Sequence, residues 1–435
     1  MTTTADAVVV GAGVIGASVA LELARSGRRV ICVDKAAGPG LGSTSASSAI
    51  VRFNYSTRDG VALAWESKHG WESWADHLRA TTGEQLAGFR RTGLVMLDTP
   101  LAPRAPALRH FDDVGVPYEV WDATTLRARV PALDPGRFGP PKPVDDDAFW
   151  ADADGELGAF FTPDAGYVDD PQLAAANLAA AARRHGSELL FGRRVTAVRR
   201  GSGRVTGLTL SDGSAVHAPV VVNCAGPWSS SLNALAGVGA DFSVGVRPLR
   251  QEVHHVRAPE DFGTGARPGP VVADLDLGVY LRGAPGGALL VGGTEPECDP
   301  MQWVDDPDHA DPNPTVPVFR AQVTRAARRL PALGVPDRPT GVAGVYDAAD
   351  DWTPIYDRTE LDGYFVAMGT SGNQFKNAPS VGALMTALVD AVGNGHDHDS
   401  HPVTWHGPHT GRAVDLGVFS RRRPRNTAST GTVLG

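Results

Sequence analysis

The chain opens on two apolar runs separated by a helical pattern. Residues 7–10 (AVVV) are all apolar and mostly β-branched, which is typical of a strand buried on both faces. The next segment, VIGASVALELARSG, has a helical pattern and ends at Gly27. A second run, RRVICVD, ends at Asp34. This order predicts strand, helix and strand, the beginning of a parallel α/β sheet.

Similar patterns return much later in the chain. Residues 218–232 (APVVVNCAGPWSSSL) predict a buried strand that runs into a turn at Gly226. The segment before them predicts a β-meander with turns at 201–203 and 211–213. Residues 363–395 predict a strand, a glycine loop and a helix. The parallel sheet is therefore expected to collect strands from distant parts of the chain.

Between the first two of these regions, the pattern predicts a loop and a long helix. Residues 36–56 are rich in Gly and Ser, which predicts a loop. In the segment that follows, Trp71, Trp74, Ala75 and Leu78 fall on one helical face.

The first turn carries a glycine motif with a known physical purpose. Gly11, Gly13 and Gly16 have GxGxxG spacing between the first strand and the helix. Gly11 allows a tight turn, Gly13 lets backbone approach a pyrophosphate, and Gly16 lets the helix pack close to the strand. Asp34 lies where a carboxylate would meet ribose hydroxyls. The arrangement predicts a dinucleotide site, but it does not separate FAD from NAD.

Length and charge narrow the class of protein. A chain of 435 residues predicts two domains. The net charge of −9 argues against a nucleic-acid or anionic-membrane surface. No apolar run reaches the roughly 18 residues of a membrane helix, and we expect no signal peptide. The dispersed Cys32, Cys224 and Cys298 suggest reduced thiols, so we expect a cytoplasmic protein.

Six stretches in this order resemble the D-amino-acid oxidase superfamily of flavoproteins. They are GAGVIG with Asp34, SSAIVRFNYS, DAGYVDDPQL, VVNCAGPW, YLRGAPGGALLVGGTE and GTSGNQFKNAPSVG. Within the superfamily, the chain is most similar to the sarcosine oxidase and dimethylglycine dehydrogenase branch. The resemblance implies an α/β, Rossmann-like (GR2-type) FAD-binding domain with an inserted β-rich α+β substrate domain.

The resemblance also implies a discontinuous domain organisation. We expect residues 1–84, 151–226 and 341–395 to form the FAD-binding domain. Residues 85–150 and 227–340 would form the substrate-binding domain, and residues 396–435 a C-terminal tail.

In sarcosine-oxidase-like enzymes, an arginine and a lysine hold the substrate carboxylate. By motif match these are Arg52 in IVRFNY and Lys376 in SGNQFKN. A guanidinium offers a planar fork to a carboxylate, and an ammonium adds a second charge. The alternatives are that Arg52 pairs with a structural acid and that Lys376 is a solvated loop residue. The helix that starts near Pro379 would direct its N-terminal dipole at the flavin.

Three further residues are candidates for the substrate site. Tyr346 matches an active-site tyrosine of the monomeric sarcosine oxidases, and Tyr280 could line the same pocket; either could instead be an ordinary packed aromatic. His254 and His255 point to opposite faces of a predicted strand, and we assign His255 provisionally to the site.

The departures from the family pattern concern the flavin. Gly344 stands where monomeric sarcosine oxidases have a flavin-linking cysteine, and the loop STSASS lacks the linking histidine of dimethylglycine dehydrogenases. We therefore expect noncovalent FAD. Leu290 stands where an oxygen-activating lysine is found, so the electron acceptor could be O2 or an electron-transfer partner.

We expect the cofactor to be contacted by residues from each of the motifs. They are Gly11, Gly13, Val14, Ile15, Gly16, Asp34, Lys35, Gly42, Ser43, Thr44, Ser48, Val195, Ala225, Gly226, Trp228, Gly344, Gly372, Asn373, Gln374, Phe375 and Lys376.

Two polar stretches suggest metal ions, but neither has ordered ligand spacing. The histidines of residues 395–409 (GHDHDSHPVTWHGPH) follow no ligand pattern, so we expect a solvated tail segment. The acidic residues 144–156 lack the glycine and terminal glutamate of an EF-hand. No metal site is predicted.

The resulting hypothesis is oxidation of the C–N bond of a secondary or tertiary, sarcosine-like amino acid by hydride transfer to flavin. One alternative is a flavin-dependent oxidase of a primary or cyclic amino acid in a biosynthetic pathway. Another is a flavin-binding subunit without chemistry of its own. The sequence names neither the substrate nor the oligomeric state.

Overall fold

The computed structural model describes residues 2–264 and 267–434. Within them, a six-stranded sheet has the order β10-β3-β2-β14-β24-β23. Its strands pair in parallel except for β23, which is antiparallel to β24. The strands are β2 (Ala7–Val10), β3 (Val30–Val33), β10 (Glu188–Leu190), β14 (Val221–Asn223), β23 (Ile355–Arg358) and β24 (Tyr364–Met368).

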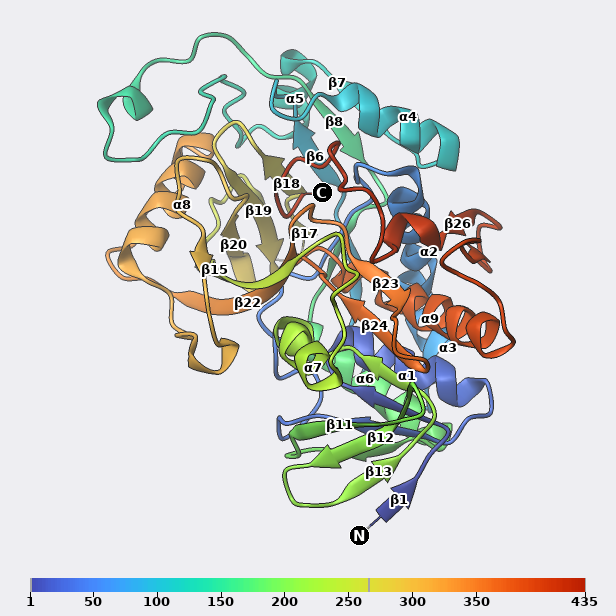
Figure 1. The fold of residues 1–435 in the computed structure, drawn as a ribbon. Helices are drawn as coiled ribbons and strands as arrows, with labels where there is room; N and C mark the ends of the chain where they lie inside the picture. Colours follow the sequence, from blue (N-terminus) through green and yellow to red (C-terminus); the bar gives the residue numbers. More distant parts are fainter. Residues whose placement is uncertain (1, 265–266, 435) are drawn as a thin grey trace.

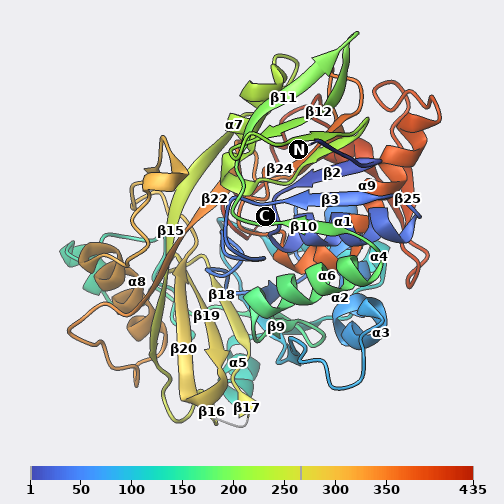
Figure 2. The same cartoon turned by 90° about the horizontal axis from the view of Figure 1, so that it is seen from below.

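This sheet is covered on both faces, as its apolar strands predict (Figure 2). Three helices cover one face, and the first contacts the other two: α1 (Val14–Arg25), α6 (Pro171–Arg184) and α9 (Ala378–Gly393). The other face meets a four-stranded sheet of β1 (Thr2–Thr4), β11 (Val195–Gly201), β12 (Arg204–Leu210) and β13 (Ala215–His217). Along β2, Ala7 and Val9 belong to the helical core, whereas Val8 and Val10 belong to the core under β11 and β12.

A nine-stranded sheet is the second large sheet of the described chain (Figure 1). Its order is β21-β15-β20-β19-β18-β6-β8-β7, and β22 pairs with β15. The strands are β6 (Leu94–Leu97), β7 (Glu119–Trp121), β8 (Ala159–Thr162), β15 (Val246–Arg257), β18 (Val271–Asp274), β19 (Val279–Ala284), β20 (Ala288–Gly293), β21 (Gln302–Trp303) and β22 (Gly341–Ala349).

The two faces of this sheet have different neighbours, because successive side chains of a strand point in opposite directions. On one face, Val95 and Val272 pack in a core with α8 (Val316–Arg329). On the other, Leu94, Val271 and Ala273 turn toward the dinucleotide-binding half of the molecule, where they line a cavity.

The remaining elements connect or flank the two large sheets. A three-stranded sheet joins β4 (Ile50–Val51), β9 (Gly166–Val168) and β5 (Phe89–Arg91). The other helices are α2 (Arg58–Glu72), α3 (Trp74–Leu78), α4 (Arg104–Val114), α5 (Ala123–Arg129) and α7 (Ser229–Ala236). Two short hairpins are β16 (Gly263–Thr264) with β17 (Arg267–Pro268), and β25 (Thr404–His406) with β26 (Ala413–Asp415).

The residue limits of the two domains stay a prediction. Strand pairing places β8 and β22 in the nine-stranded sheet, although the predicted limits group residues 151–226 and 341–395 with the FAD-binding domain. Helix α7, inside the predicted substrate-binding range, instead packs against β11.

The C-terminal segment packs on the rest of the protein, so the expectation of a solvated segment at 395–409 is wrong in part. His396, His401, His406 and His409 are exposed, but His398 and Trp405 are buried. His398 Nε2 lies 3.2 Å from Asp357 of β23, and its Nδ1 accepts the backbone N–H of Val403. In the described chain, no group of three or more His, Cys, Asp or Glu side chains could hold a metal ion.

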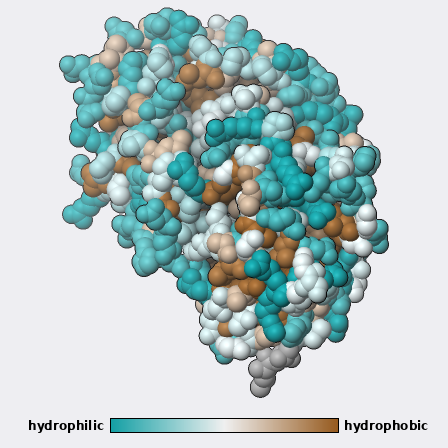
Figure 3. All heavy atoms as spheres, viewed as in Figure 1, coloured by the Kyte–Doolittle hydropathy of each residue, from teal (hydrophilic) through white to brown (hydrophobic). Residues whose placement is uncertain are grey.

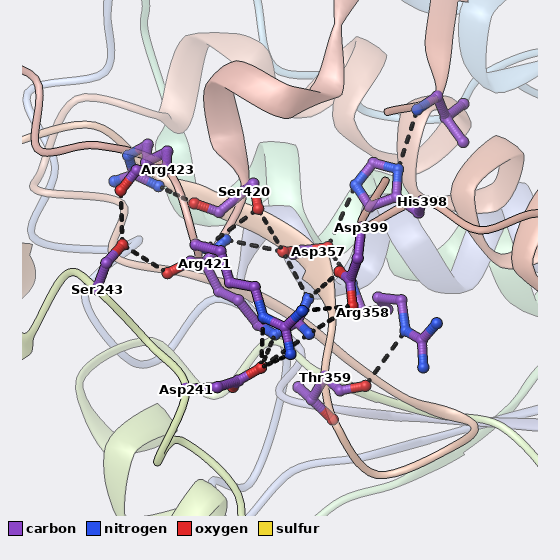
Figure 4. Close-up of polar contacts among 12 residues, drawn as sticks. Asp241, Ser243, Asp357, Arg358, Thr359, His398, Asp399, Ser420, Arg421 and Arg423 are labelled. Atoms are coloured by element: carbon purple, nitrogen blue, oxygen red, sulfur yellow. Dashed lines mark hydrogen bonds and ion pairs between the residues drawn. The ribbon is translucent and has the colours of Figure 1, made fainter. Parts of the chain in front are cut away.

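A buried arginine anchors the segment further on (Figure 4). The Arg421 guanidinium is fully buried and contacts Asp241, Asp357 and Asp399 at 2.7–3.1 Å. Two residues later, Arg423 pairs with Asp351 at 2.8 Å. Apolar side chains cannot supply such directional contacts, and the sequence alone does not show which acids lie opposite these arginines.

The surface follows the ordinary division of polar and apolar residues. Figure 3 shows hydrophilic residues over most of one face and apolar residues gathered toward its centre and lower half. Among the described residues, no helix combines the length and apolar character needed to cross a membrane.

Candidate functional site

A cavity of about 430 Å³ lies at the carboxyl ends of the parallel strands. Gly11 and Gly13 line it from the first turn, Asp34 from the end of β3, and Ala225 and Gly226 from the turn after β14. The carboxyl edge of such a sheet is where nucleotides bind in this architecture.

The glycines of the first turn are required by close backbone packing. Gly11 has φ +106°, and a Cβ there would lie 2.2 Å from the Cys224 carbonyl oxygen. A Cβ at Gly16 would lie 1.9 Å from the Gly11 oxygen. Both positions therefore exclude any side chain, and the N-terminus of α1 can face the cavity at short range.

Polar side chains stabilise the same turn. Asp34 Oδ2 accepts the N–H of Ala12 at 2.7 Å, and its Oδ1 accepts the N–H of Ala36 at 2.8 Å. Thr44 Oγ1 accepts the N–H of Val14 at 3.1 Å, which places a hydroxyl at the first turn of α1. The loop that the sequence predicts at 36–56 thus closes one side of the cavity.

Two polar atoms that face this cavity lack a partner in the described chain. They are Trp228 Nε1 and Asp347 Oδ2, both buried. Burial raises the pKa of Asp347. Buried polar groups are normally hydrogen-bonded, so a donor and an acceptor here are available to a ligand.

Most of the residues predicted to contact the cofactor line this cavity. Lining are Gly11, Gly13, Val14, Ile15, Gly16, Asp34, Lys35, Gly42, Ser43, Thr44, Val195, Ala225, Gly226, Trp228, Gly372, Gln374 and Phe375. The exceptions are Ser48, Asn373 and Lys376, which line a second cavity, and Gly344, which lines neither. A Cβ at Gly344 would approach Ala46 to 2.7 Å, so Gly344 packs closely against the loop at 36–56 without lining either cavity.

The second cavity, of about 50 Å³, adjoins the first. Ser47, Tyr346, Gly372 and Phe375 line both. Leu94, Val271, Ala273 and Tyr280 of the nine-stranded sheet close it on one side. Its other walls include Arg52, Lys376 and two residues of the C-terminal segment, Val433 and Leu434.

Arg52 and Lys376 meet in this cavity, and both are buried with 3% and 2% of their surface exposed. Lys376 Nζ donates to the Tyr55 hydroxyl at 3.0 Å and to the Asn373 carbonyl. Arg52 donates to the carbonyls of Asn54 and Val433. Their hydrogen-bond partners are three carbonyls and a hydroxyl, and neither forms an ion pair with an acid of the described chain. Burial and the nearby Arg52 hold the pKa of Lys376 well below its ordinary value.

The position of Lys376 depends on α2. Trp71 of this helix donates its indole N–H to the Lys376 carbonyl at 2.7 Å and stacks on Phe375 at 5.4 Å. Helix α9 begins at Ala378, immediately after the loop. The lysine is therefore held by a rigid element on each side.

The two predicted tyrosines line the same space. Tyr346, on β22, packs over Gly372, where a Cβ would lie 2.3 Å from its ring. Tyr280, on β19, makes a 2.7 Å hydrogen bond with Ser48. Burial raises the pKa of Tyr280 to about 12 and that of Tyr346 well above its ordinary value. Both are therefore neutral hydroxyls at physiological pH.

His255 is the exception among the predicted site residues. It is exposed on β15 and lines neither cavity, so its provisional assignment to the site is corrected. Its neighbour His254 points the other way and meets Phe319 of α8, with ring centroids 5.1 Å apart. The strand alternation was predicted, but the face of the sheet that α8 covers was not.

Sequence reasoning missed Glu295 and the C-terminal segment. Glu295 follows β20 and accepts the N–H of Val433 at 2.7 Å. It ends the stretch YLRGAPGGALLVGGTE, in which only Tyr280 and Leu290 were considered. No motif marks residues 432–434, because their place at the cavity depends on how the preceding segment is anchored.

Comparison with known proteins gives a consistent picture. The family described as FAD dependent oxidoreductase (DAO) matches residues 6–388. Glycine oxidase of Geobacillus kaustophilus is 27% identical over 93% of this chain and 98% of its own. Its crystal structure superposes with a TM-score of 0.71 at 26% identity, covering 93% and 99% of the two chains.

Two other relatives act on N-methylated compounds, according to their names. Monomeric sarcosine oxidase of Streptomyces avermitilis is 26% identical over 89% of this chain and 94% of its own. 4-Methylaminobutanoate oxidase (formaldehyde-forming) of Paenarthrobacter nicotinovorans is 29% identical over 90% of this chain, which spans only 44% of that protein.

Proposed function

The chain belongs to the FAD dependent oxidoreductase (DAO) family, and we propose that it oxidises the C–N bond of a secondary or tertiary, sarcosine-like amino acid. Family and relatives make it an FAD-dependent amino acid oxidoreductase. The proposal concerns the substrate class and the residues that bind it.

The larger cavity fits an FAD. Its glycine turn, the N-terminus of α1 and Asp34 suit a pyrophosphate and a ribose. Trp228 Nε1 and Asp347 Oδ2 offer a donor and an acceptor that the protein itself leaves unpaired. Bound FAD would supply the acceptor for a hydride equivalent.

One observation carries the proposal: Arg52 and Lys376 are buried in one small cavity without an acidic partner in the described chain. A buried cation without a counter-charge is costly, so such a pair favours an anionic ligand. A carboxylate suits the pair, because guanidinium binds it through a fork and ammonium as a point charge.

The same residues influence the reacting amine. Two cations close to the ligand disfavour an ammonium form, so they would help to keep the amine neutral. Tyr280, Tyr346 and the apolar residues of the sheet exclude water from the small space. These residues therefore bind, orient and desolvate the amino acid.

Arg52→Ala and Lys376→Ala test the carboxylate site. Each should lower kcat/KM for the amino acid by about 100-fold or more, as expected from losing a charged hydrogen bond worth about 3 kcal/mol. The amide of the same amino acid serves as the control substrate and should be affected far less. Equal losses for both substrates would contradict the proposal.

The substrate class is tested by anaerobic titration of the purified holoenzyme with N-methylated, cyclic and primary amino acids. Bleaching of the flavin band by N-methylated amino acids alone is the expected result. Bleaching by glycine alone would favour the second candidate, a primary amino acid oxidase, which the similarity to glycine oxidase supports. Admitting air after reduction then distinguishes O2 from another acceptor.

The predicted noncovalent attachment has its own test. Acid precipitation of the protein should release yellow FAD into the supernatant. Colour that stays in the pellet would contradict noncovalent binding.

A further inference from the structure

The residues that face the smaller cavity from the C-terminal segment are held by their backbone. Arg52 Nη2 donates to the Val433 carbonyl at 2.5 Å, and Glu295 Oε2 accepts the Val433 N–H at 2.7 Å. Val433 and Leu434 are buried, with 7% and 6% of their surface exposed. A single residue is thus bound at its carbonyl by a cation and at its nitrogen by a carboxyl group.

This arrangement matches the polar groups of an amino acid. The sequence of atoms N–Cα–C=O in Val433 is the same as in a free α-amino acid, and besides Cα its nitrogen carries one hydrogen and one further carbon, as in a secondary amino acid. Arg52 binds the carbonyl where a carboxylate would bind. Glu295 binds the nitrogen where the amine would lie.

Glu295 has a second oxygen that no described group satisfies. Its Oε1 is buried and has no hydrogen-bond partner in the described chain. Burial is the main cause of the raised pKa of Tyr280 and Tyr346, which line the cavity, and the charge of Glu295 adds a smaller contribution to both. Burial raises the pKa of Glu295 itself to about 8. The carboxyl group is hydrogen-bonded to Val433, which lines the cavity, so its unpaired oxygen is available, when ionised, to an N–H donor at that position.

The segment that carries Val433 is anchored and then exposed. Arg423 pairs with Asp351, and Asn426 Nδ2 donates to Ser56 at 2.9 Å. Thr427, Ala428 and Gly431 are exposed, and Thr432 begins the buried end. A short tether therefore connects a fixed point to the residues in the cavity, and such tethers give effective concentrations in the millimolar range.

We propose that residues 432–434 occupy the amino-acid site as an internal ligand, and that Glu295 is the group that binds the substrate amine. The inference rests on the proposed function and narrows its substrate class. An N–H is needed for the Glu295 bond, so a secondary amino acid is favoured over a tertiary one. Substrate must displace the segment before it can bind between Arg52 and Glu295.

The test uses two small ligands and the FAD-loaded protein. 2-Aminoisobutyrate has no hydrogen on Cα and cannot be oxidised there, and isobutyrate is the same molecule without the amine. Their dissociation constants are measured by calorimetry at about pH 9, above the pKa of about 8 that burial gives Glu295, on the full chain, on a chain that ends at Ser429, and on the shortened chain with Glu295→Gln. Thr427→Ala in the full chain is the control, because Thr427 lies exposed in the tether.

The shortened chain should bind both ligands about 10-fold or more tightly than the full chain, because residues 432–434 are missing and no longer compete for the site. Glu295→Gln should then weaken 2-aminoisobutyrate about 10-fold and leave isobutyrate within about twofold. Thr427→Ala should match the full chain. Equal affinities for the full and shortened chains, or equal effects of Glu295→Gln on both ligands, would overturn the proposal.

A peptide separates this inference from the proposed function. An acetylated and amidated peptide with the sequence of residues 430–434 should bind the shortened chain and be displaced by isobutyrate. If the peptide binds but isobutyrate does not displace it, the two ligands do not share a site. That result overturns the internal ligand, even if amino acids still reduce the flavin. Displacement without flavin reduction by any amino acid leaves the internal ligand in place and contradicts the proposed function.

Discussion

The two cavities of this protein are built in different ways. The larger is lined by the turns that follow β2, β14 and β24, and in the first of them Gly11 brings backbone against the backbone of Cys224. The smaller is lined by single side chains from at least four distant segments, including Arg52, Tyr280, Lys376 and Val433. The comparison shows that spacing and periodicity alone predict a site made from a backbone turn, whereas converging side chains were found only where a family motif marks them, and Glu295 and Val433 were missed.

The largest effect is expected at the larger cavity, from Gly11→Ala. The positive φ and the 2.2 Å approach to Cys224 oxygen leave no room for a Cβ. We expect a loss of stability above about 4 kcal/mol and purification without FAD. Denaturant unfolding and the ratio of flavin to protein absorbance measure both.

Gly27→Ala is the matched control for that change. Gly27 also has a positive φ, of +88°, but nothing lies within 4 Å of its would-be Cβ. Gly27→Ala should lower the free energy of unfolding by only about 1–2 kcal/mol, and the variant should still purify with flavin. If the two variants behaved alike, backbone crowding would not be what sets this cavity apart.

The next effect concerns the anchor of the segment that closes the smaller cavity. Arg421→Met leaves buried Asp357 without its cation, so the free energy of unfolding should fall by about 3–5 kcal/mol. Arg422 contacts Asp241 and Asp399 too, but its side chain is 49% exposed. Arg422→Met should therefore cost at most about 1 kcal/mol in the same urea titration. Comparable losses would show that burial does not decide the strength of this anchor.

A smaller effect of opposite sign is expected at Lys376. Lys376→Met removes a buried lysine that has no acidic partner and whose pKa is lowered by burial, so it should stabilise the protein by about 1–3 kcal/mol at pH 7 while abolishing activity. The paired Lys68, 3.1 Å from Glu72, is the control, and Lys68→Met should not stabilise. A loss of stability in Lys376→Met would mean that burying this lysine without an acidic partner carries no net cost.

The stability gained in Lys376→Met should depend on pH, and the sign of this dependence follows from the pKa of Lys376. The pKa of Lys376 lies well below its ordinary value of 10.5 in the folded protein, so the unfolded chain binds the extra proton. The wild-type protein is therefore penalised below pH 10.5, and the penalty decreases as the pH rises toward that value. The difference in unfolding free energy between Lys376→Met and wild type should narrow between pH 7 and about pH 10.

The smallest effect is expected at His255, which belongs to neither cavity. His255→Ala should leave kcat/KM within about twofold and stability within about 0.5 kcal/mol, as for other exposed positions. A large loss of kcat/KM would return this histidine to the site.

The sequence by itself determined the dinucleotide fold and much of the larger cavity. Runs such as residues 7–10, the spacing of Gly11, Gly13 and Gly16, and Asp34 are local features that translate directly into strand, turn and helix. Motif resemblance added Arg52, Lys376, Tyr280 and Tyr346 as candidates, and the fold brings these four side chains to one cavity. Their roles in binding and catalysis stay predictions.

Only the tertiary structure decided which distant residues meet at the smaller cavity and behind its walls. Glu295 and Val433 are 138 residues apart and meet through one hydrogen bond, and Arg52 reaches Val433 across 381 residues. Likewise, only packing against α8 decided which of two adjacent histidines is buried. Periodicity and spacing act over a few residues, whereas these contacts depend on buried ion pairs such as Arg421 with Asp357, whose partners no local pattern specifies.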